Sequence, residues 1–408
     1  MTKRKNFFLI LLLGSLTALG PFSIDMYLPG FPAIAKDLHT TVARVSLSLS
    51  VFFIGISIGQ LLYGPLLDRF GRKKPLYIGL SVYIISSIGC AYATSIDALI
   101  ILRFIQAVGS CAAAVASIAM VRDLFPLNEN AKVFALLMLV VGVSPMIAPT
   151  VGGYVTTAFG WHSVFIVLML LGLVNLLASI FGLPDSYKPD LSISLKPKPI
   201  ITNFIAVLRE PQFYTYALTG SVAFAGLFAY VAGSPLLFMD IYAVSEENYG
   251  WIFAFLSIGL IGSSQLNTMM LKKYSSEQVI FAALIFQAVT GIIFLAGSIN
   301  GWFGLPETIG LLFVFLGCLG FASPNTSALS LAPFSKNAGS ASALMGAVQM
   351  GLGTIASIGV SLFDTRSSLP MVAIMASTSL IALAILYFGR KNIKIKVDAG
   401  KEGAAVFH

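Results

Sequence analysis

Charged side chains are scarce in this chain of 408 residues. Only 10% of the residues are Asp, Glu, Lys or Arg, whereas 57% are hydrophobic. Soluble globular proteins carry roughly 25% charged residues. This composition excludes an ordinary soluble protein and indicates a chain that lies mostly within a membrane.

Histidine and cysteine are also rare, and neither is spaced for chemistry. The three histidines fall in expected loops or the tail: His39, His162 and His408. The three cysteines fall in apolar segments, where no disulfide framework is expected: Cys90, Cys111 and Cys318. The sequence has no His and Cys set with metal-ligand spacing and no phosphate-binding loop. We therefore expect no enzyme, metal or cofactor, and a membrane-embedded enzyme or channel is the disfavoured class.

Long apolar segments take up nearly the whole chain. A helix needs about 20 apolar residues to cross the hydrocarbon layer of a membrane. Twelve segments of this kind predict an all-α membrane protein with twelve transmembrane helices. They are expected near residues 7–30, 46–67, 75–95, 97–120, 133–156, 163–183, 213–235, 249–270, 277–299, 307–331, 339–363 and 370–389.

The distribution of Lys and Arg predicts the orientation. With the N-terminus inside, 21 of the 25 cations fall on cytoplasmic segments, three fall in outer loops, and Arg103 lies within a span. Cytoplasmic loops of membrane proteins carry such an excess of Lys and Arg. Both termini are therefore expected in the cytoplasm. Contact with anionic membrane lipid explains the net charge of +8, so no nucleic acid is expected as a partner.

An internal repeat indicates two similar halves. The Ser-Ile-Gly triplet at 57–59 recurs at 257–259, and the basic pair at 72–73 recurs at 272–273, both with an offset of 200 residues. Prolines and lysines near residues 184–211 are typical of a linker. The expected organisation is an N-terminal six-helix half at 1–187, a cytoplasmic linker at 188–211, a C-terminal six-helix half at 212–390 and a cytoplasmic tail at 391–408.

Two ionisable residues lie inside the expected spans. Asp25 falls in the first span and Arg103 in the fourth, where a bare charge costs roughly 2.5–3.5 kcal/mol on insertion scales. Such residues normally face the protein interior and pair. Gln106 and Ser110 share the helical face of Arg103, so we expect a polar stripe along a central cavity. The alternative is that Asp25 and Arg103 lie near the outer water interface and only cap helix ends.

Two motifs indicate moving parts. The loop after the second span reads GPLLDRFGRKK at 64–74, where glycines permit a tight turn and Asp68 can reach a helix N-terminus or a cation of the other half. The fifth span contains two prolines, which kink helices, and a glycine pair, which allows close backbone approach. The expected gating residues are Gly64, Asp68, Arg69, Gly71, Arg72, Pro145, Pro149, Gly152 and Gly153.

These motifs resemble those of a known transporter family. The loop at 64–74 resembles the signature loop of the major facilitator superfamily. Residues 142–153 resemble the antiporter motif of its drug-exporting members, with Ala148 where glycine is usual. DMYLPGFPAIA at 25–35, LRFIQAVG at 102–109 and YVAGSPLLFMDIYAVSEENYG at 230–250 look like the Bcr/CflA family of proton-coupled drug exporters. The resemblance implies the major facilitator fold, with two pseudo-symmetric six-helix halves, in a bacterial inner membrane.

The same resemblance assigns proton coupling to Asp25 and Arg103. If their contact is made in one conformation and broken in the other, the proton affinity of the carboxylate alternates with access. Because Arg103 offsets the charge of Asp25, we expect neutral or zwitterionic drugs as substrates. The alternative is a superfamily transporter of another small solute, such as a metabolite exporter or a sugar symporter.

Several residues are candidates for lining the substrate cavity, because aromatic rings offer walls and amides offer hydrogen bonds. They are Tyr27, Gln106, Ser110, Phe224, Phe228, Tyr230, Asn325 and Gln349. Plain helix packing explains each of them equally well. The expected partners are the drug, protons and membrane lipid, and the protein is expected to be a monomer.

Overall fold

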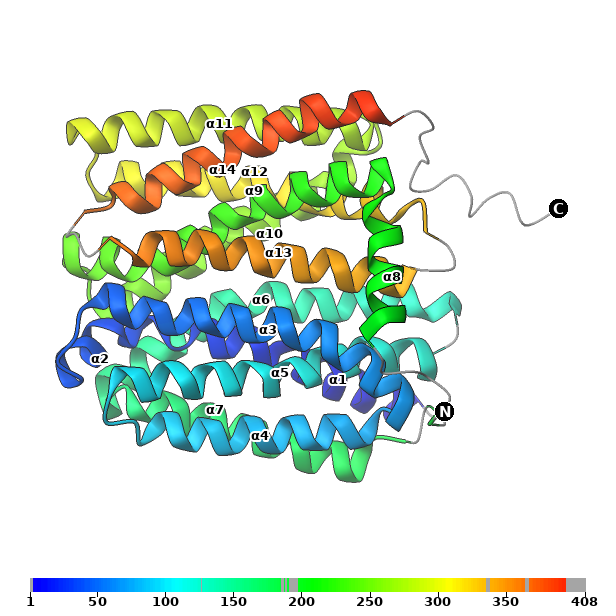
Figure 1. The fold of residues 1–408 in the computed structure, drawn as a ribbon. Coiled ribbons are helices and arrows are strands. Elements are labelled where there is room, and N and C mark those ends of the chain that lie inside the picture. Colours follow the sequence, from blue (N-terminus) through cyan, green and yellow to red (C-terminus); the bar gives the residue numbers. More distant parts are fainter. Residues whose placement is uncertain are drawn as a thin grey trace. The chain divides into compact units, whose positions relative to one another are not determined.

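The computed structural model describes residues 3–125, 127–184, 187, 189–190, 197–334, 338–363 and 367–393. Within these residues the chain forms helices and no strand (Figure 1). The elements are α1 (Lys3–Asp25), η1 (Leu28–Gly30), α2 (Phe31–Asp37), α3 (Val42–Phe70), α4 (Lys73–Ala91), α5 (Ile96–Leu124), α6 (Leu127–Phe159), α7 (His162–Gly182), α8 (Pro197–Leu208), α9 (Pro211–Pro235), η2 (Leu236–Ile241), α10 (Glu246–Met270), α11 (Ser276–Asn300), α12 (Leu305–Leu331), α13 (Ala338–Ser361), α14 (Leu369–Gly389) and η3 (Arg390–Asn392).

Twelve helical segments of the described chain are long and apolar enough to cross a membrane, which confirms the predicted number. The predicted ends of the first and seventh spans, at residues 30 and 235, are wrong. These spans run over Phe7–Asp37 and Pro211–Ile241, each 31 residues long. The sequence placed these ends at Gly30 and Pro235. In the structure the first span continues past Gly30, from the 3₁₀-helix η1 into α2. The seventh span continues past Pro235 as the π-helix η2.

The chain divides into two compact units. The first unit comprises Met1–Leu195, Ser234–Phe255 and Ser361–Arg366, and the second comprises Lys196–Gly233, Leu256–Val360 and Ser367–His408. The division into two six-helix halves joined by a linker at 188–211 stays a prediction. Within that linker, residues 188 and 191–196 lie outside the described residues, as do residues 394–408 of the expected tail.

Small residues bring α5 close to α3 in the first unit. A methyl group on Gly55 would lie 2.6 Å from Cβ of Ala107, and one on Gly59 would lie 2.7 Å from Cβ of Cys111. Small residues let helix backbones approach closely in membranes, where van der Waals packing drives association. This packing fixes α5, which carries Arg103.

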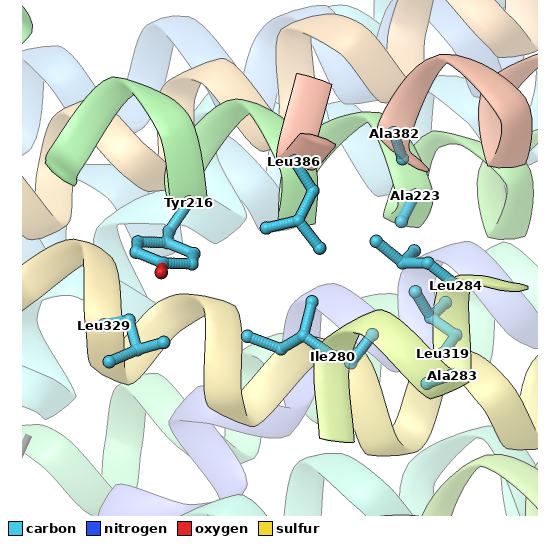
Figure 2. Close-up of a cluster of buried hydrophobic side chains, with 10 residues drawn as sticks. Tyr216, Ala223, Ile280, Ala283, Leu284, Leu319, Leu329, Ala382 and Leu386 are labelled. Carbon is cyan, nitrogen blue, oxygen red and sulfur yellow. The ribbon is translucent and has the colours of Figure 1, made fainter. Parts of the chain in front are cut away.

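A cluster of buried apolar side chains joins α9, α11, α12 and α14 in the second unit (Figure 2). Its members are Tyr216, Ala223, Ile280, Ala283, Leu284, Leu319, Ala322, Leu329, Ala382 and Leu386. The Tyr216 hydroxyl also donates a hydrogen bond to Glu277 at the start of α11. The cluster fixes α9, which carries three of the predicted cavity residues.

Candidate functional site

The first span loses its α-helical geometry directly after Asp25. α1 ends at this residue, and Pro29 and Pro32 follow in η1 and α2, where neither can donate a backbone hydrogen bond. The Asp25 side chain is only 5% exposed, and the span continues to Asp37. Irregular backbone at membrane depth is tolerated where protein surrounds it. Asp25 therefore lies at an interruption within a span.

Arg103 on α5 is completely buried and donates to two oxygen atoms. Its Nη1 donates to Oε1 of Gln106 at 2.5 Å, and its Nη2 donates to the carbonyl oxygen of Ser23 on α1 at 2.8 Å. Its Nε has no hydrogen-bond partner among the residues that the structure describes. A buried charge is costly unless hydrogen bonds compensate it, so these two oxygens stabilise the cation in place.

Three aromatic rings complete the surroundings of Arg103. Its guanidinium carbon lies 4.2 Å from the ring centroid of Phe52, 4.6 Å from that of Tyr27 and 5.8 Å from that of Phe165. A cation within about 6 Å of an aromatic face is attracted to it, most strongly without water. Arg103 is therefore held by side chains of α3 and α7 and by Tyr27, which follows α1. None of these three rings supplies a negative charge.

Asp25 and Arg103 do not form an ion pair in this structure. Among the described residues, no hydrogen bond or ion pair involves the Asp25 carboxylate, and Arg103 bonds instead to the carbonyl of Ser23, two residues earlier. Both side chains are buried. The structure therefore brings Arg103, Gln106 and Tyr27 together, and the coupling role of Asp25 and Arg103 stays a prediction.

Hydroxyl groups extend the polar network around Arg103. Three hydrogen-bonded pairs belong to it: Gln106 Nε2 with Ser87 Oγ at 2.7 Å, Ser23 Oγ with Tyr83 OH at 2.8 Å, and Tyr27 OH with Ser48 Oγ at 2.5 Å. At Gln106 the predicted polar stripe on α5 is therefore buried, and the side chain is hydrogen-bonded to Arg103 and Ser87. The Ser110 hydroxyl donates to the carbonyl of Ala107 on its own helix.

The sequence did not point to several of these residues. The hydroxyl-rich stretch from Tyr83 to Ser87 in the third span is a signal that could have indicated a polar partner for the fourth span. Phe52 and Phe165 carry no such signal, because aromatic residues are common throughout these spans. Ser23 contributes its backbone carbonyl to Arg103, and side-chain identity does not predict that contact.

A second ionic cluster lies between α3, α4 and α5. Arg72 donates from Nη1 to Asp68 at 2.5 Å and from Nε to Asp123 at 2.7 Å. Burial lowers the pKa of the Arg72 guanidinium, but its hydrogen bonds to Asp123 and Asp68 raise it, and the net direction is upward. The ring of Tyr187 lies 4.1 Å from the guanidinium carbon. Arg72 therefore joins two carboxylates in one structural cluster.

The loop around this cluster is shorter than the sequence indicates. α3 continues through Gly64 to Phe70, and α4 begins at Lys73, so only Gly71 and Arg72 lie between the helices. Gly71 has a φ of 81° and supplies the turn that both glycines were expected to supply. Asp68 accepts from Arg72 four residues later, and Arg69 lies beside the ring of Phe70, at 5.7 Å. The gating role of these residues stays a prediction.

We expect Asp123→Asn to destabilise the protein more than Asp68→Asn. The Asp123 side chain is only 15% exposed, so losing its charge-assisted hydrogen bonds should cost about 1.5–3 kcal/mol. Asp68 is 48% exposed, and such ion pairs contribute about 0–1 kcal/mol. Thermal unfolding of the two detergent-purified variants measures the difference. Equal midpoints, or a larger decrease for Asp68→Asn, would contradict this structural account.

The prolines and glycines of the fifth span lie inside one helix, α6. A side chain on Gly152 would overlap the backbone of Met26, directly after Asp25, and one on Gly153 would lie 2.5 Å from the carbonyl oxygen of Glu246. Thr157, one turn later, donates to the Glu246 carboxylate at 3.2 Å. Gly152 and Gly153 therefore seat α6 against the interruption of the first span and the start of α10. Pro149 lies one turn before them and Pro145 two turns before them.

The predicted cavity residues of α9 are packed against neighbours. The rings of Phe224 and Phe228 form an edge-to-face pair with centroids 5.5 Å apart, and a side chain on Gly353 of α13 would overlap Phe228. Phe224 also packs against the cluster of Figure 2. Tyr230 is only 1% exposed. Helix packing accounts for these contacts, and a substrate contact of the three residues stays a prediction.

The two predicted amide contacts differ in their surroundings. Asn325 of α12 is buried and donates from Nδ2 to Oδ1 of Asn267 on α10 at 2.7 Å. Gln349 of α13 lines a cavity of only about 10 Å³ within the second unit, together with hydroxyl-bearing side chains that include Ser221 and Thr326. Asn325 thus links two helices, whereas Gln349 lies at a polar hollow.

Residues 13–360 match the family model described as Major Facilitator Superfamily. The chain is 34% identical to the uncharacterized MFS-type transporter YdgK of Bacillus subtilis, over 95% of this chain and 96% of the relative. It is 32% identical to the bicyclomycin resistance protein homolog of Haemophilus influenzae (96% and 98%). It is 27% identical to the multidrug resistance protein MdtL of Escherichia coli O139:H28 (92% and 93%).

A solved structure shares the fold at low sequence identity. The D-xylose-proton symporter superposes with a TM-score of 0.72 and 14% identity, over 93% of this chain and 97% of that one. An identity this low supports the architecture alone. Together with the twelve apolar helices, the likeness confirms the predicted fold class.

Proposed function

Because this chain belongs to the Major Facilitator Superfamily and is a multi-pass membrane transporter rather than an enzyme, we propose that it exports small drugs in exchange for protons. The names of the bicyclomycin-resistance and multidrug-resistance relatives support drugs as the substrate class. The observation that carries the proton part is the buried Asp25 carboxylate, without an ion-pair partner among the described residues, at the interruption of the first span. Intramembrane carboxylates commonly carry protons in transporters.

The proton cycle that we propose uses the neighbouring positions of Ser23 and Asp25. Arg103 is held by the Ser23 carbonyl here, and the Asp25 carboxylate lies only two residues further along the chain. A shift of the α1 end brings that carboxylate to Arg103 in place of the carbonyl. A guanidinium beside a carboxylate favours its charged form, so the shift releases a proton on one side of the membrane. The return movement allows a proton to bind from the other side.

Substrate charge follows from the same pair. Arg103 and Asp25 carry opposite charges, so their surroundings hold no surplus charge to select lipophilic cations. Neutral or zwitterionic drugs fit this balance. The excess of cations on one set of loops supports an inner-membrane protein with both termini in the cytoplasm. We propose a monomer, since one chain supplies all twelve helices.

Growth of a pump-deficient bacterium that expresses this chain tests the substrate class. We expect raised inhibitory concentrations for neutral or zwitterionic antibacterials, such as bicyclomycin and amphenicols, and no change for lipophilic cations. The Asp25→Asn variant, expressed at the same level in the membrane, is the matched control and should give no protection. Protection confined to lipophilic cations would contradict the proposed substrate charge. No protection despite normal membrane expression would favour a transporter of another solute.

A further inference from the structure

An open apolar groove lies between α11 and α14 of the second unit, and its volume is about 300 Å³. The two helices pack side by side (Figure 1), and a methyl group on Gly291 of α11 would lie 3.0 Å from Cα of Ala376 on α14. Both helices are membrane spans, so a groove on their outer side meets the bilayer. The residues that line it are Phe281 and Ile285 of α11 and Leu380, Leu383, Ala384 and Tyr387 of α14.

The groove lies directly outside the apolar cluster of Figure 2. Phe281 and Leu383 pack against that cluster, so they separate the groove from the interior. Ile285, Leu380 and Tyr387 are 38%, 44% and 43% exposed. The groove is therefore part of the outer surface of the second unit, and none of the predicted substrate-cavity residues lines it.

Two cations lie at one end of this groove. The guanidinium carbon of Arg390 lies 5.4 Å from the ring centroid of Phe281 and 5.2 Å from that of Tyr387, and both rings line the groove. The ammonium nitrogen of Lys391 lies 4.8 Å from the ring centroid of Tyr387. Neither cation forms an ion pair with another described residue. Aromatic rings therefore hold both cations beside the groove, and both charges remain able to pair with an anion.

Contacts with α9 fix the segment that carries the two cations. Nδ2 of Asn392, directly after them, donates a hydrogen bond to the hydroxyl of Tyr214 at 3.4 Å. A side chain on Gly389, directly before them, would lie 2.7 Å from Cγ2 of Thr215. The end of α14 and η3 are thus packed onto α9, which keeps the cations at this end of the groove.

The groove has the length of one membrane leaflet. From Leu380, which lines it, to Gly389 at the end of α14, the helix rises about 14 Å at about 1.5 Å for each residue. The hydrocarbon of one leaflet is about 15 Å thick, half of the bilayer core. Arg390 and Lys391 follow Gly389, so they lie at the depth of the headgroups when the groove lies in the hydrocarbon.

We propose that this groove binds one anionic phospholipid. An acyl chain lies along Ile285, Leu380 and Ala384, and the headgroup phosphate pairs with Arg390 and Lys391. A guanidinium matches phosphate oxygens through two parallel hydrogen bonds, and basic pockets between transmembrane helices bind anionic headgroups. Only the identity of the leaflet, the cytoplasmic one, rests on the proposed orientation of the transporter.

A lipid fits this groove better than a second protein does. Stable protein interfaces take roughly 20–30 residues from each partner, whereas six side chains line the groove. Apolar walls with two cations at one end match a molecule that has an apolar tail and an anionic head. The size and the charge of the groove therefore favour the same occupant.

Native mass spectrometry of the full-length protein in detergent tests the proposal. Phosphatidylglycerol is titrated into the delipidated wild type and into Arg390→Gln with Lys391→Gln, and the dissociation constant of the first bound lipid is measured. Each cation strengthens such binding roughly five-fold, so we expect the double variant to bind about 30-fold more weakly. Lys272→Gln with Lys273→Gln removes the same charge from an exposed pair that does not adjoin the groove, and it should bind like the wild type.

Filling the groove is the second arm of this experiment. Ala384→Phe occupies the groove from an exposed position, whereas Ala282→Phe adds the same ring at an exposed residue of α11 that does not line it. We expect only Ala384→Phe to weaken binding of the first phosphatidylglycerol. Phosphatidylcholine, whose headgroup has no net charge, should bind the wild type more weakly than phosphatidylglycerol does.

Two outcomes would overturn the lipid site. The first is unchanged affinity for phosphatidylglycerol in the Arg390 and Lys391 variant or in Ala384→Phe, because the site needs both its charge and its groove. The second is a dimer mass that Ala384→Phe abolishes, which would indicate a second copy of the chain in the groove. All substituted side chains are exposed, and the masses are measured without transport, so a failure of drug export leaves the test unaffected.

Discussion

Replacing Asp25 by asparagine should reduce proton-driven export to the level of vesicles without protein. Asparagine has nearly the same shape, but it carries no proton between the two sides. The carboxylate makes no ion pair among the described residues, so the fold should lose little stability. Drug efflux from inside-out or right-side-out vesicles under an imposed pH gradient measures the loss, and drug binding to the purified variant shows whether the site is retained.

Asp97→Asn is the matched control for this prediction. Asp97 pairs with Arg44 at 2.9 Å, but their side chains are 70% and 53% exposed, so this ion pair contributes little. We expect near wild-type export from the Asp97 variant. Active export by Asp25→Asn under a pH gradient would remove Asp25 from the coupling role, whereas loss in both variants would indicate a general effect of acidic residues.

Arg103→Lys should lose most export, and Arg103→Ala should lose all of it. The guanidinium donates from two nitrogens to Gln106 and to the Ser23 carbonyl while it lies 4.2 Å from the ring centroid of Phe52. A lysine ammonium is a point charge without this planar fork. It cannot reproduce both contacts and then exchange the carbonyl for Asp25. Drug efflux measured at several external pH values tests this prediction.

The two variants also separate coupling from stability. Arg103→Ala leaves the Gln106 and Ser23 oxygens without their donor, and each unsatisfied buried group lowers the free energy of unfolding by about 1–3 kcal/mol. Membrane insertion and unfolding must therefore be measured beside efflux. Arg44→Lys, at an exposed arginine, should export like the wild type. Wild-type efflux by Arg103→Lys across the pH range would contradict the coupling role and favour a helix-capping role.

The sequence predicted the twelve spans because each requires only length and low charge. It placed the ends of two spans wrongly, at Gly30 and Pro235. In the structure the first span passes through η1 to Asp37, and the seventh passes through η2 to Ile241. Proline removes one hydrogen bond and fixes one φ angle. Whether the chain then stops or continues depends on neighbouring helices.

The charged residues of the candidate site could be predicted from the sequence, but their contacts could not. Asp25 and Arg103 were found because a charge within a span is costly and rare. Their separation was not predictable, because the carbonyl of Ser23 and the rings of Phe52 and Phe165 satisfy Arg103 through tertiary packing. Gly64 illustrates the same limit, since it lies inside α3 while Gly71 alone of the two glycines has a positive φ.

Proton release on drug binding tests the central claim of proton-coupled export most directly. Purified protein in weakly buffered detergent receives a drug identified by the growth assay, while a pH indicator follows free protons and a parallel assay follows drug binding. We expect the wild type to release protons as drug binds, and Asp25→Asn to bind drug without releasing any. Drug binding to the wild type without proton release, or with proton uptake as in a symporter, would contradict that claim.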